Sequence, residues 1–125
     1  MLGFHSHQRF YVYAADTDMR CGYNSLSGII RNELQSDPVN GDVYIFFNKP
    51  RDIIKILVWD GDGFVLYYKK LEKGRFEKLV TADKKYSIRY DHLVMLIGGI
   101  SLQKVHQRKR FSLNKNNEQY TQINV

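Results

Sequence analysis

The fold is most strongly constrained by the stretch IIKILVWDGDGFVLYYKKLEKGRF, residues 53–76. Two runs rich in β-branched and aromatic residues, Ile53–Trp59 and Phe64–Leu71, flank the tetrad Asp60-Gly61-Asp62-Gly63. This pattern is typical of a β-hairpin. Asp-Gly dipeptides supply the positive φ angles of a tight turn, because glycine lacks Cβ and aspartate tolerates the left-handed region. The sequence therefore predicts two antiparallel strands here.

Successive side chains of a strand point to opposite faces of the sheet. In the first strand of the hairpin, Ile54, Ile56 and Val58 share a wholly apolar face. Lys55 lies on the other face. We therefore expect the isoleucine and valine face to be the one that packs against the rest of the protein.

A strand at 9–15 and a helix are expected before the hairpin. The side chains of Asp16, Thr17 and Asp18 are suited to cap the start of the helix, since their oxygens can accept from its unpaired amides. One apolar stripe at helical spacing follows: Met19, Tyr23, Leu26, Ile30 and Leu34. Gly28 inside this helix costs about 1 kcal/mol relative to alanine, and close packing against a sheet would compensate for it.

The pair Asp37-Pro38 is expected to end that helix, because the residue before a proline is pushed out of the helical region. A strand is predicted at 43–48, and with the hairpin it would form an antiparallel meander. Residues 81–85 are expected to form a loop, and a second helix is predicted at 88–100. The order β-α-β-β-β-α predicts an α+β domain, with an antiparallel sheet whose helices cover one face.

Length and composition are those of a single folded domain. The chain has 125 residues, of which 43% are hydrophobic, too apolar for a disordered chain. No apolar run approaches the roughly 18 to 20 residues that span a bilayer, and the start MLGFHSHQRF lacks the order of a signal peptide. With Cys21 as the one cysteine, these features favour a cytoplasmic protein with no membrane partner.

The positive charge is unevenly distributed along the chain. Residues 1–100, the expected folded domain, carry 14 basic and 12 acidic side chains, whereas residues 101–125 carry 5 basic and 1 acidic. The second segment has little apolar content, so it is predicted to be a flexible basic tail. A basic balance fits a polyanionic partner such as nucleic acid. A solvated tail that only aids solubility is the alternative.

Three groups of cations are candidate DNA contacts, because cations that approach phosphates displace counterions from DNA. They are the helix residue Arg20 with Lys55, the hairpin group Lys69, Lys70, Lys73 and Arg75, and the tail group Arg108, Lys109 and Arg110. Trp59, Tyr67 and Tyr68 could stack on bases or contact a protein partner. The alternatives are a solvated surface for the cations and packing on the sheet for the aromatic residues.

Several segments together resemble one protein family. They are Thr17-Asp18-Met19-Arg20 with Gly22, then Asp37-Pro38, Gly41, Phe46 and Asn48, and finally the segment 55–76. In these positions the chain resembles the TnpB accessory proteins of IS66-type insertion sequences, in register over residues 9–76. The resemblance implies a small protein of a bacterial mobile element, needed for transposition alongside a separately encoded transposase that carries the catalytic acids.

Catalytic and metal sites have little support in the sequence. Asp16, Asp18, Asp60 and Asp62 could in principle hold Mg²⁺, but each already suits a cap or a glycine turn. The histidines show no zinc spacing with the single cysteine: His5, His7, His92 and His106. We therefore expect no enzyme activity, no metal and no cofactor.

Two functions remain open at this point. In the first, the protein assists transposition by binding DNA, either at the element ends or at the target, through its basic hairpin and tail. In the second, the aromatic residues and the basic ribbon dock onto the transposase, so the protein is an adaptor that assembles the transposition complex.

Overall fold

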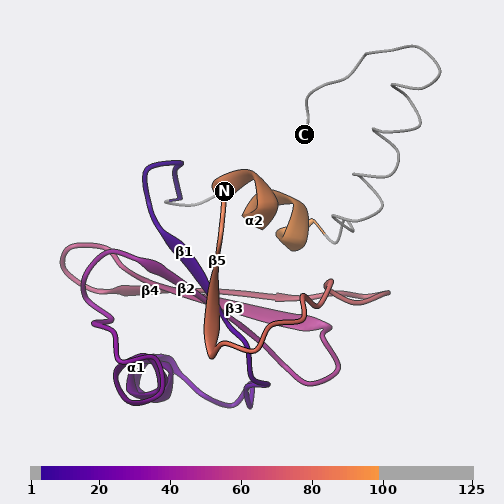
Figure 1. Cartoon of the computed structure of the whole chain (residues 1–125), viewed down its shortest axis with the longest axis horizontal. Helices are drawn as coiled ribbons and strands as arrows, with labels where there is room; N and C mark the ends of the chain where they lie inside the picture. The colour runs from indigo at the N-terminus through magenta and orange to yellow at the C-terminus, as the bar shows by residue number, and fades with distance from the viewer. Residues whose placement is uncertain (1–3, 99–125) are drawn as a thin grey trace, which may run out of the picture.

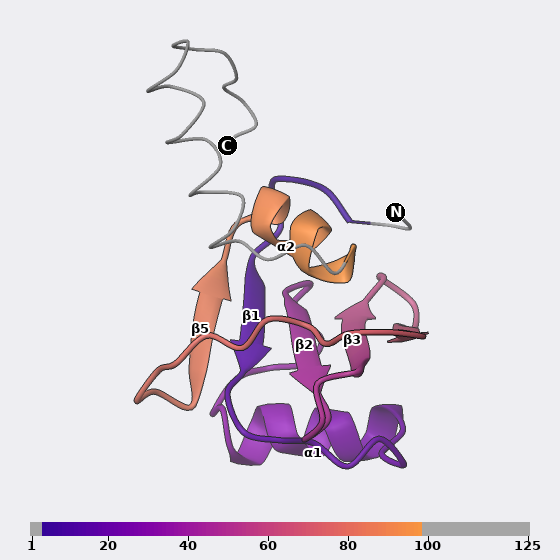
Figure 2. The same cartoon turned by 90° about the vertical axis from the view of Figure 1, so that its right-hand side faces the viewer.

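The computed structural model describes residues 4–98, which form an α+β domain. Its sheet has five strands in the order β4-β3-β2-β1-β5. The strands are β1 (Phe10–Tyr13), β2 (Val43–Phe47), β3 (Ile53–Trp59), β4 (Phe64–Lys70) and β5 (Lys85–Ile88), and the helices are α1 (Tyr23–Asn32) and α2 (Tyr90–Ile97). Figure 2 shows β5, β1, β2 and β3 side by side, with α1 crossing below them and α2 lying above. None of the helices between residues 4 and 98 is long and apolar enough to span a membrane.

The predicted hairpin and meander are confirmed. β3 pairs antiparallel with β4 from Ile53↔Lys70 to Trp59↔Phe64, and β2 pairs antiparallel with β3. The amide of Asp60 donates to the carbonyl of Gly63 at 2.8 Å. Gly61 has a φ of 92°, the left-handed conformation for which glycine is suited.

The prediction of a wholly antiparallel sheet was wrong for one pair of strands. β1 runs parallel to β2, and α1 connects them as a crossover. Parallel neighbours need such a long connection, since a tight turn can only join antiparallel strands. The resulting β-α-β unit places α1 against one face of the sheet.

The prediction that both helices cover one face was also wrong. Ile56 of β3 packs in one core cluster with Leu93 of α2. The next residue, Leu57, packs in a second cluster with Leu26 and Ile30 of α1. Because neighbouring strand residues point to opposite faces, the helices lie on opposite sides of the sheet, as Figure 1 shows. Both faces of the central strands are therefore buried.

The start of the first helix differs from the prediction. α1 begins at Tyr23 after the extended residue Gly22, with no side-chain cap, and not after the cap predicted at residues 16–18. Asp18 instead accepts from the amide of Arg20 at 2.9 Å in a separate turn. The Asp18 carboxylate thus accepts from a backbone amide as a helix cap would, but the hydrogen bond stabilises the turn that precedes the helix.

The expected close packing at Gly28 is absent. A Cβ built at this position would have no heavy atom within 4 Å beyond its own helix and neighbours. The cost of glycine in α1 is therefore not offset by a close approach of the sheet.

The fifth strand was missed by sequence reasoning. The segment predicted as a loop at 81–85 leads into β5, which pairs antiparallel with β1 from Phe10↔Ile88 to Tyr13↔Lys85. The alternation of Tyr86 and Ile88 with polar neighbours was the available signal. The predicted helix at 88–100 is present over Tyr90–Ile97, and the predicted tail lies outside the described residues.

Candidate nucleic-acid interface

Two loops meet at one end of the sheet. The first, residues 48–52, joins β2 to β3, and the second, residues 71–78, follows β4. The amide of Leu71 donates to the carbonyl of Asp52 at 2.8 Å, and the amide of Phe76 donates to the carbonyl of Arg51 at 2.6 Å. Loops far apart in the sequence are thus joined by backbone hydrogen bonds.

Asn48 organises the first loop through its side chain. Its Oδ1 accepts from the amides of Asp52 at 3.1 Å and Ile53 at 3.0 Å, and its Nδ2 donates to Asp52 Oδ1 at 2.6 Å. Lys70 Nζ contacts the other oxygen, Asp52 Oδ2, at 3.0 Å. The hydrogen bonds from Asn48 and Lys70 lower the pKa of Asp52, so this carboxylate stays charged and keeps β4 attached to the loop.

Arg51 joins the two loops from within the protein. Its side chain is buried, its Nη2 donates to the carbonyl of Glu77 at 2.6 Å, and its guanidinium lies 3.9 Å from the centre of the Phe47 ring. Burial lowers the pKa of Arg51, but a guanidinium remains charged in proteins. The stacking and the hydrogen bond offset part of the cost of burying this charge, while Nε has no hydrogen-bond partner among the described residues.

Four exposed cations are carried by this joined pair of loops. None of them has an ion pair or hydrogen bond with another residue in the range 4–98. Gly74, with a φ of 79°, turns the second loop between two of them, and the buried ring of Phe76 anchors it. We call the four the loop cations: Lys49, Lys73, Arg75 and Lys78.

Two of the lysines predicted to contact DNA are engaged with the protein itself. Lys69 Nζ donates to the carbonyl of Ile97 at 2.7 Å, whereas Lys70 pairs with Asp52. Because they are neighbours on β4, they point to opposite faces of the sheet. The cluster of four that looked continuous in the sequence is therefore divided, and Lys73 and Arg75 are its exposed, unpaired members.

Lys55 has a structural position and not a surface one. It is buried at 7% exposure, and its Nζ donates to the carbonyls of Met19 at 2.7 Å and Cys21 at 2.8 Å. These contacts hold the segment before α1 against β3. They also draw the carbonyls away from helical pairing, which explains why α1 begins later than predicted. We therefore leave Lys55 out of the candidate interface.

Arg20 is exposed but paired with a neighbour. Its guanidinium contacts Asp18 through both Nε and Nη2, and this hydrogen bonding lowers the pKa of Asp18 to about 2. Its role in DNA binding stays a prediction. Arg108, Lys109 and Arg110 lie outside the described residues, so their role stays a prediction too.

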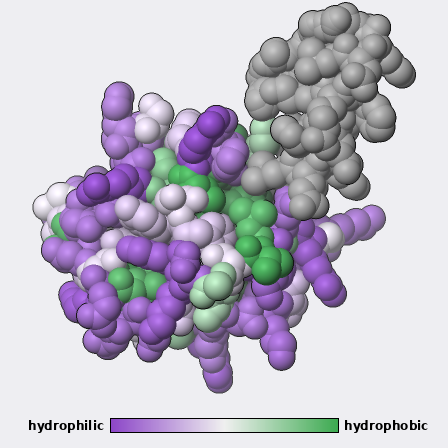
Figure 3. Space-filling view, in the orientation of Figure 1, coloured by the Kyte–Doolittle hydropathy of each residue, from purple (hydrophilic) through white to green (hydrophobic). Residues whose placement is uncertain are grey.

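The three candidate aromatic residues differ in their surroundings. Trp59 lies edge-on to Phe64 with ring centres 5.1 Å apart. Tyr67 packs against the core cluster that contains Leu93 of α2. Tyr68 is 53% exposed, so it is the best placed of the three to contact a partner. Figure 3 shows that hydrophilic side chains predominate on the face in view, with hydrophobic ones in separate patches.

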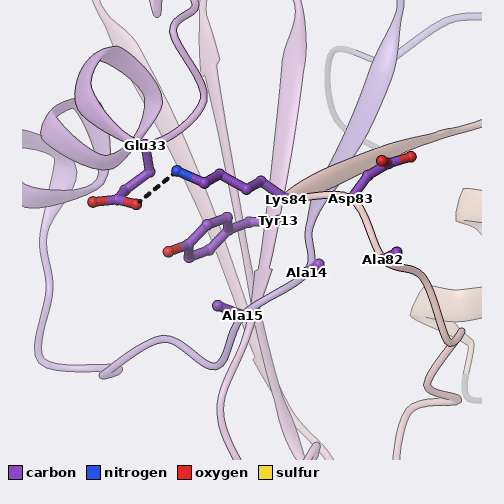
Figure 4. Close-up of a pocket in the computed structure, with 7 residues that line it drawn as sticks. All are labelled: Tyr13, Ala14, Ala15, Glu33, Ala82, Asp83 and Lys84. Carbon is purple, nitrogen blue, oxygen red and sulfur yellow. Dashed lines mark ion pairs between the residues drawn. The ribbon is translucent and has the colours of Figure 1, made fainter.

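A pocket of about 330 Å³ lies between the end of β1, the end of α1 and the segment before β5. Its walls include Tyr13 and three alanines, and Glu33 pairs with Lys84 across it at 3.6 Å, as Figure 4 shows. Glu33 and Lys84 thus pair with each other, and Asp83 is the remaining charged residue of the lining. Among the described residues, no three His, Cys, Asp or Glu side chains lie close enough together to hold a metal ion.

Comparison with known proteins assigns the family. A family model described as IS66 Orf2 like protein matches residues 8–107. The chain belongs to this family. The resemblance drawn from the sequence is thereby confirmed, and membership of this family implies an accessory role in insertion-sequence transposition.

Two curated relatives come from Sinorhizobium fredii. The uncharacterized protein y4hO is 33% identical over 76 residues, which cover 61% of this chain and 66% of y4hO, just under two thirds of its length. The uncharacterized protein y4jC is 29% identical over 108 residues, which cover 86% of this chain and 92% of y4jC. No solved structure matches the chain.

Several of the residues that carried the resemblance to the IS66 family stabilise the fold of this protein. Asp18 and Arg20 form the paired turn, Gly22 begins α1, and Asn48 organises the β2–β3 loop. Asn48 is followed directly by Lys49, one of the loop cations. Of these residues, Asn48 is the one that holds a loop of the candidate interface, a role that sequence reasoning alone did not reveal.

Proposed function

We propose that this IS66 Orf2-like protein assists transposition by binding DNA without catalysing a reaction on it. The observation that carries the proposal is the set of loop cations, which are exposed and have no ion pair with other described residues. They stand on two loops that are joined by backbone hydrogen bonds and by the side chain of Arg51. The backbone of both loops is held in place before a polyanion binds, so binding has to order only the side chains of the four cations and not the loops.

The chemistry of the loop cations favours phosphate contacts over base readout. Three of the four are lysines, which act as point charges toward phosphates, and Arg75 can form a bidentate contact. A lysine that neutralises a phosphate releases counterions, and this release drives binding that depends little on DNA sequence. The proposed role is therefore electrostatic capture of DNA, for the transposase to act on.

The double variant Lys73→Gln/Arg75→Gln tests this role. Binding of labelled duplex and single-stranded DNA is measured by fluorescence anisotropy over a salt series. We expect weaker binding and a shallower plot of log affinity against log salt, and on duplex DNA the slope falls by about 0.9 for each phosphate that is no longer neutralised.

The matched control is Arg31→Gln/Lys84→Gln, which removes the same charge from the end of α1 and the segment before β5. It should leave the salt slope close to that of the unmodified protein. Equal weakening in both double variants would contradict a localised interface. If the unmodified protein fails to bind DNA at low salt yet co-purifies with the transposase from nuclease-treated lysate, the adaptor role replaces DNA binding.

A further inference from the structure

The outer edge of β4 has backbone groups that face no other strand among residues 4–98. Of the described strands, β4 is an outermost one and borders only β3. The bonds from Asp60 N to Gly63 O and from Leu71 N to Asp52 O show that the odd-numbered residues of β4 bond to β3. Since bonded and non-bonded pairs alternate in antiparallel strands, the even-numbered residues direct their N–H and C=O groups outward: Phe64, Leu66, Tyr68 and Lys70.

This edge lacks the features that usually prevent pairing with another chain. Natural edge strands are commonly short, or carry proline, a bulge or central charges. β4 has seven residues, with no proline and no charge from Phe64 to Tyr68. Val65 and Tyr68 are 37% and 53% exposed, so apolar surface accompanies the open backbone.

We propose that a second copy of this chain pairs with β4, strand to strand and antiparallel, about a two-fold axis. Two five-stranded sheets then join into one continuous sheet. A two-fold contact requires a self-complementary surface, in which each residue faces its partner's equivalent in reverse order. β4 and the turn before it meet this condition, because Asp62 lies in the turn two residues before Phe64 and Lys70 ends the strand.

Three registers place the two-fold axis within one residue of the middle of β4, at Leu66, Tyr67 or Tyr68, and charge selects one of them. With the axis at Leu66, Asp62 of each copy lies opposite Lys70 of the other, and Phe64 lies opposite Tyr68. With the axis at Tyr67, Asp62 would lie opposite Glu72. With the axis at Tyr68, Lys70 would lie opposite Leu66, so Asp62 and Lys70 would not meet. Opposite charges across strands stabilise a sheet and like charges destabilise it, so the axis lies at Leu66.

The existing contacts of Lys70 are compatible with this pairing. Its ammonium contacts Asp52 at 3.0 Å while its side chain remains 59% exposed. An ammonium has three donor hydrogens, so it can also reach Asp62 of the second copy. The loop cations are not needed for this contact, so the dimer and DNA binding can be tested separately.

The first experiment blocks the edge without disturbing the hairpin. Leu66→Pro removes an amide that points outward and leaves the bonds to β3 in place. Sedimentation velocity over a concentration series should show a dimer for the unmodified protein and a monomer for Leu66→Pro, with circular dichroism unchanged. A monomeric unmodified protein, even one that binds the transposase, would overturn the proposal.

The other edge of the sheet provides the matched control. Ser87 is exposed on β5, and the bond from Ala14 N to Lys84 O places its amide outward by the same alternation. Ser87→Pro should therefore remain dimeric. A dimer that survives Leu66→Pro, or that dissociates equally in Ser87→Pro, would show that copies do not meet at β4.

A charge exchange tests the register and does not depend on proline. Asp62→Lys should weaken the dimer about tenfold, because two attractive pairs become repulsive. Adding Lys70→Asp reverses the pair in sign, and Asp52→Asn is added with it to remove the like-charge contact that Lys70→Asp would make with Asp52. This triple variant should restore most of the affinity. If the triple variant is no tighter than Asp62→Lys alone, the axis does not lie at Leu66.

Discussion

At the scale of the residue, burial determines what a cation can do. Lys55 and Lys73 are chemically identical, yet the first is enclosed with two backbone carbonyls and the second is exposed. Whether a lysine on a strand stabilises the fold or is free to bind a partner can be decided only when the element that covers its face of the sheet is known. Arg51 makes the same point, since it belongs to a loop rich in charge and is nevertheless buried over Phe47.

Lys55→Met provides a test at this scale. Methionine keeps most of the apolar stem but leaves the carbonyls of Met19 and Cys21 without their donor. We expect the free energy of unfolding in urea to fall by about 2 kcal/mol, since hydrogen bonds to charged groups are the stronger ones. Lys78→Met, the control at an exposed site, should change it by less than about 0.5 kcal/mol. Unchanged stability in Lys55→Met would show that its hydrogen bonds are dispensable.

At the scale of the element, local sequence and packing disagree most clearly in α1. The apolar stripe correctly indicated a helix whose Leu26 and Ile30 are buried. However, the helix begins at Tyr23, because the residues before it are held by Asp18 and Lys55. Gly28 remains within the helix although the space around it is open.

Gly28→Ala should stabilise the protein. Alanine restricts the unfolded chain and favours the helix, and the added Cβ meets no atom within 4 Å. We expect a gain of about 0.5 to 1 kcal/mol, measured by thermal unfolding. Gly74→Ala is the contrasting variant, because its φ of 79° strains any other residue, and it should be less stable by about 1 kcal/mol. A decrease in both variants would mean that α1 packs more tightly than described.

At the scale of the whole molecule, two layers of helix enclose the sheet and leave its two edge strands at the sides. β2 is buried at every position, as expected of a strand with both faces covered. Its uninterrupted apolar run, VYIFF, was the signal that a second layer existed. The chain beyond residue 98 adds most of the net charge, since residues 101–125 contain 5 basic side chains and 1 acidic one.

Removal of residues 101–125 should separate the contributions of domain and tail to DNA binding. If the tail binds phosphates, the shortened chain binds DNA more weakly, and its salt slope on duplex DNA falls by about 0.9 for each phosphate that the tail had neutralised. The remaining affinity should still depend on Lys73 and Arg75, as measured by anisotropy of the shortened double variant. An unchanged salt slope after truncation would show that the tail does not bind DNA.

The sequence by itself determined the hairpin, the strand at 43–48, the presence of both helices and the family. These features depend on turn chemistry, side-chain periodicity and motifs, all of which are local. Only the tertiary structure decided that β1 and β2 are parallel, that the helices lie on opposite faces and that Lys55 is buried while the loop cations are exposed. The physical reason is that these properties depend on contacts between residues far apart in the chain, and no short window of sequence contains both partners.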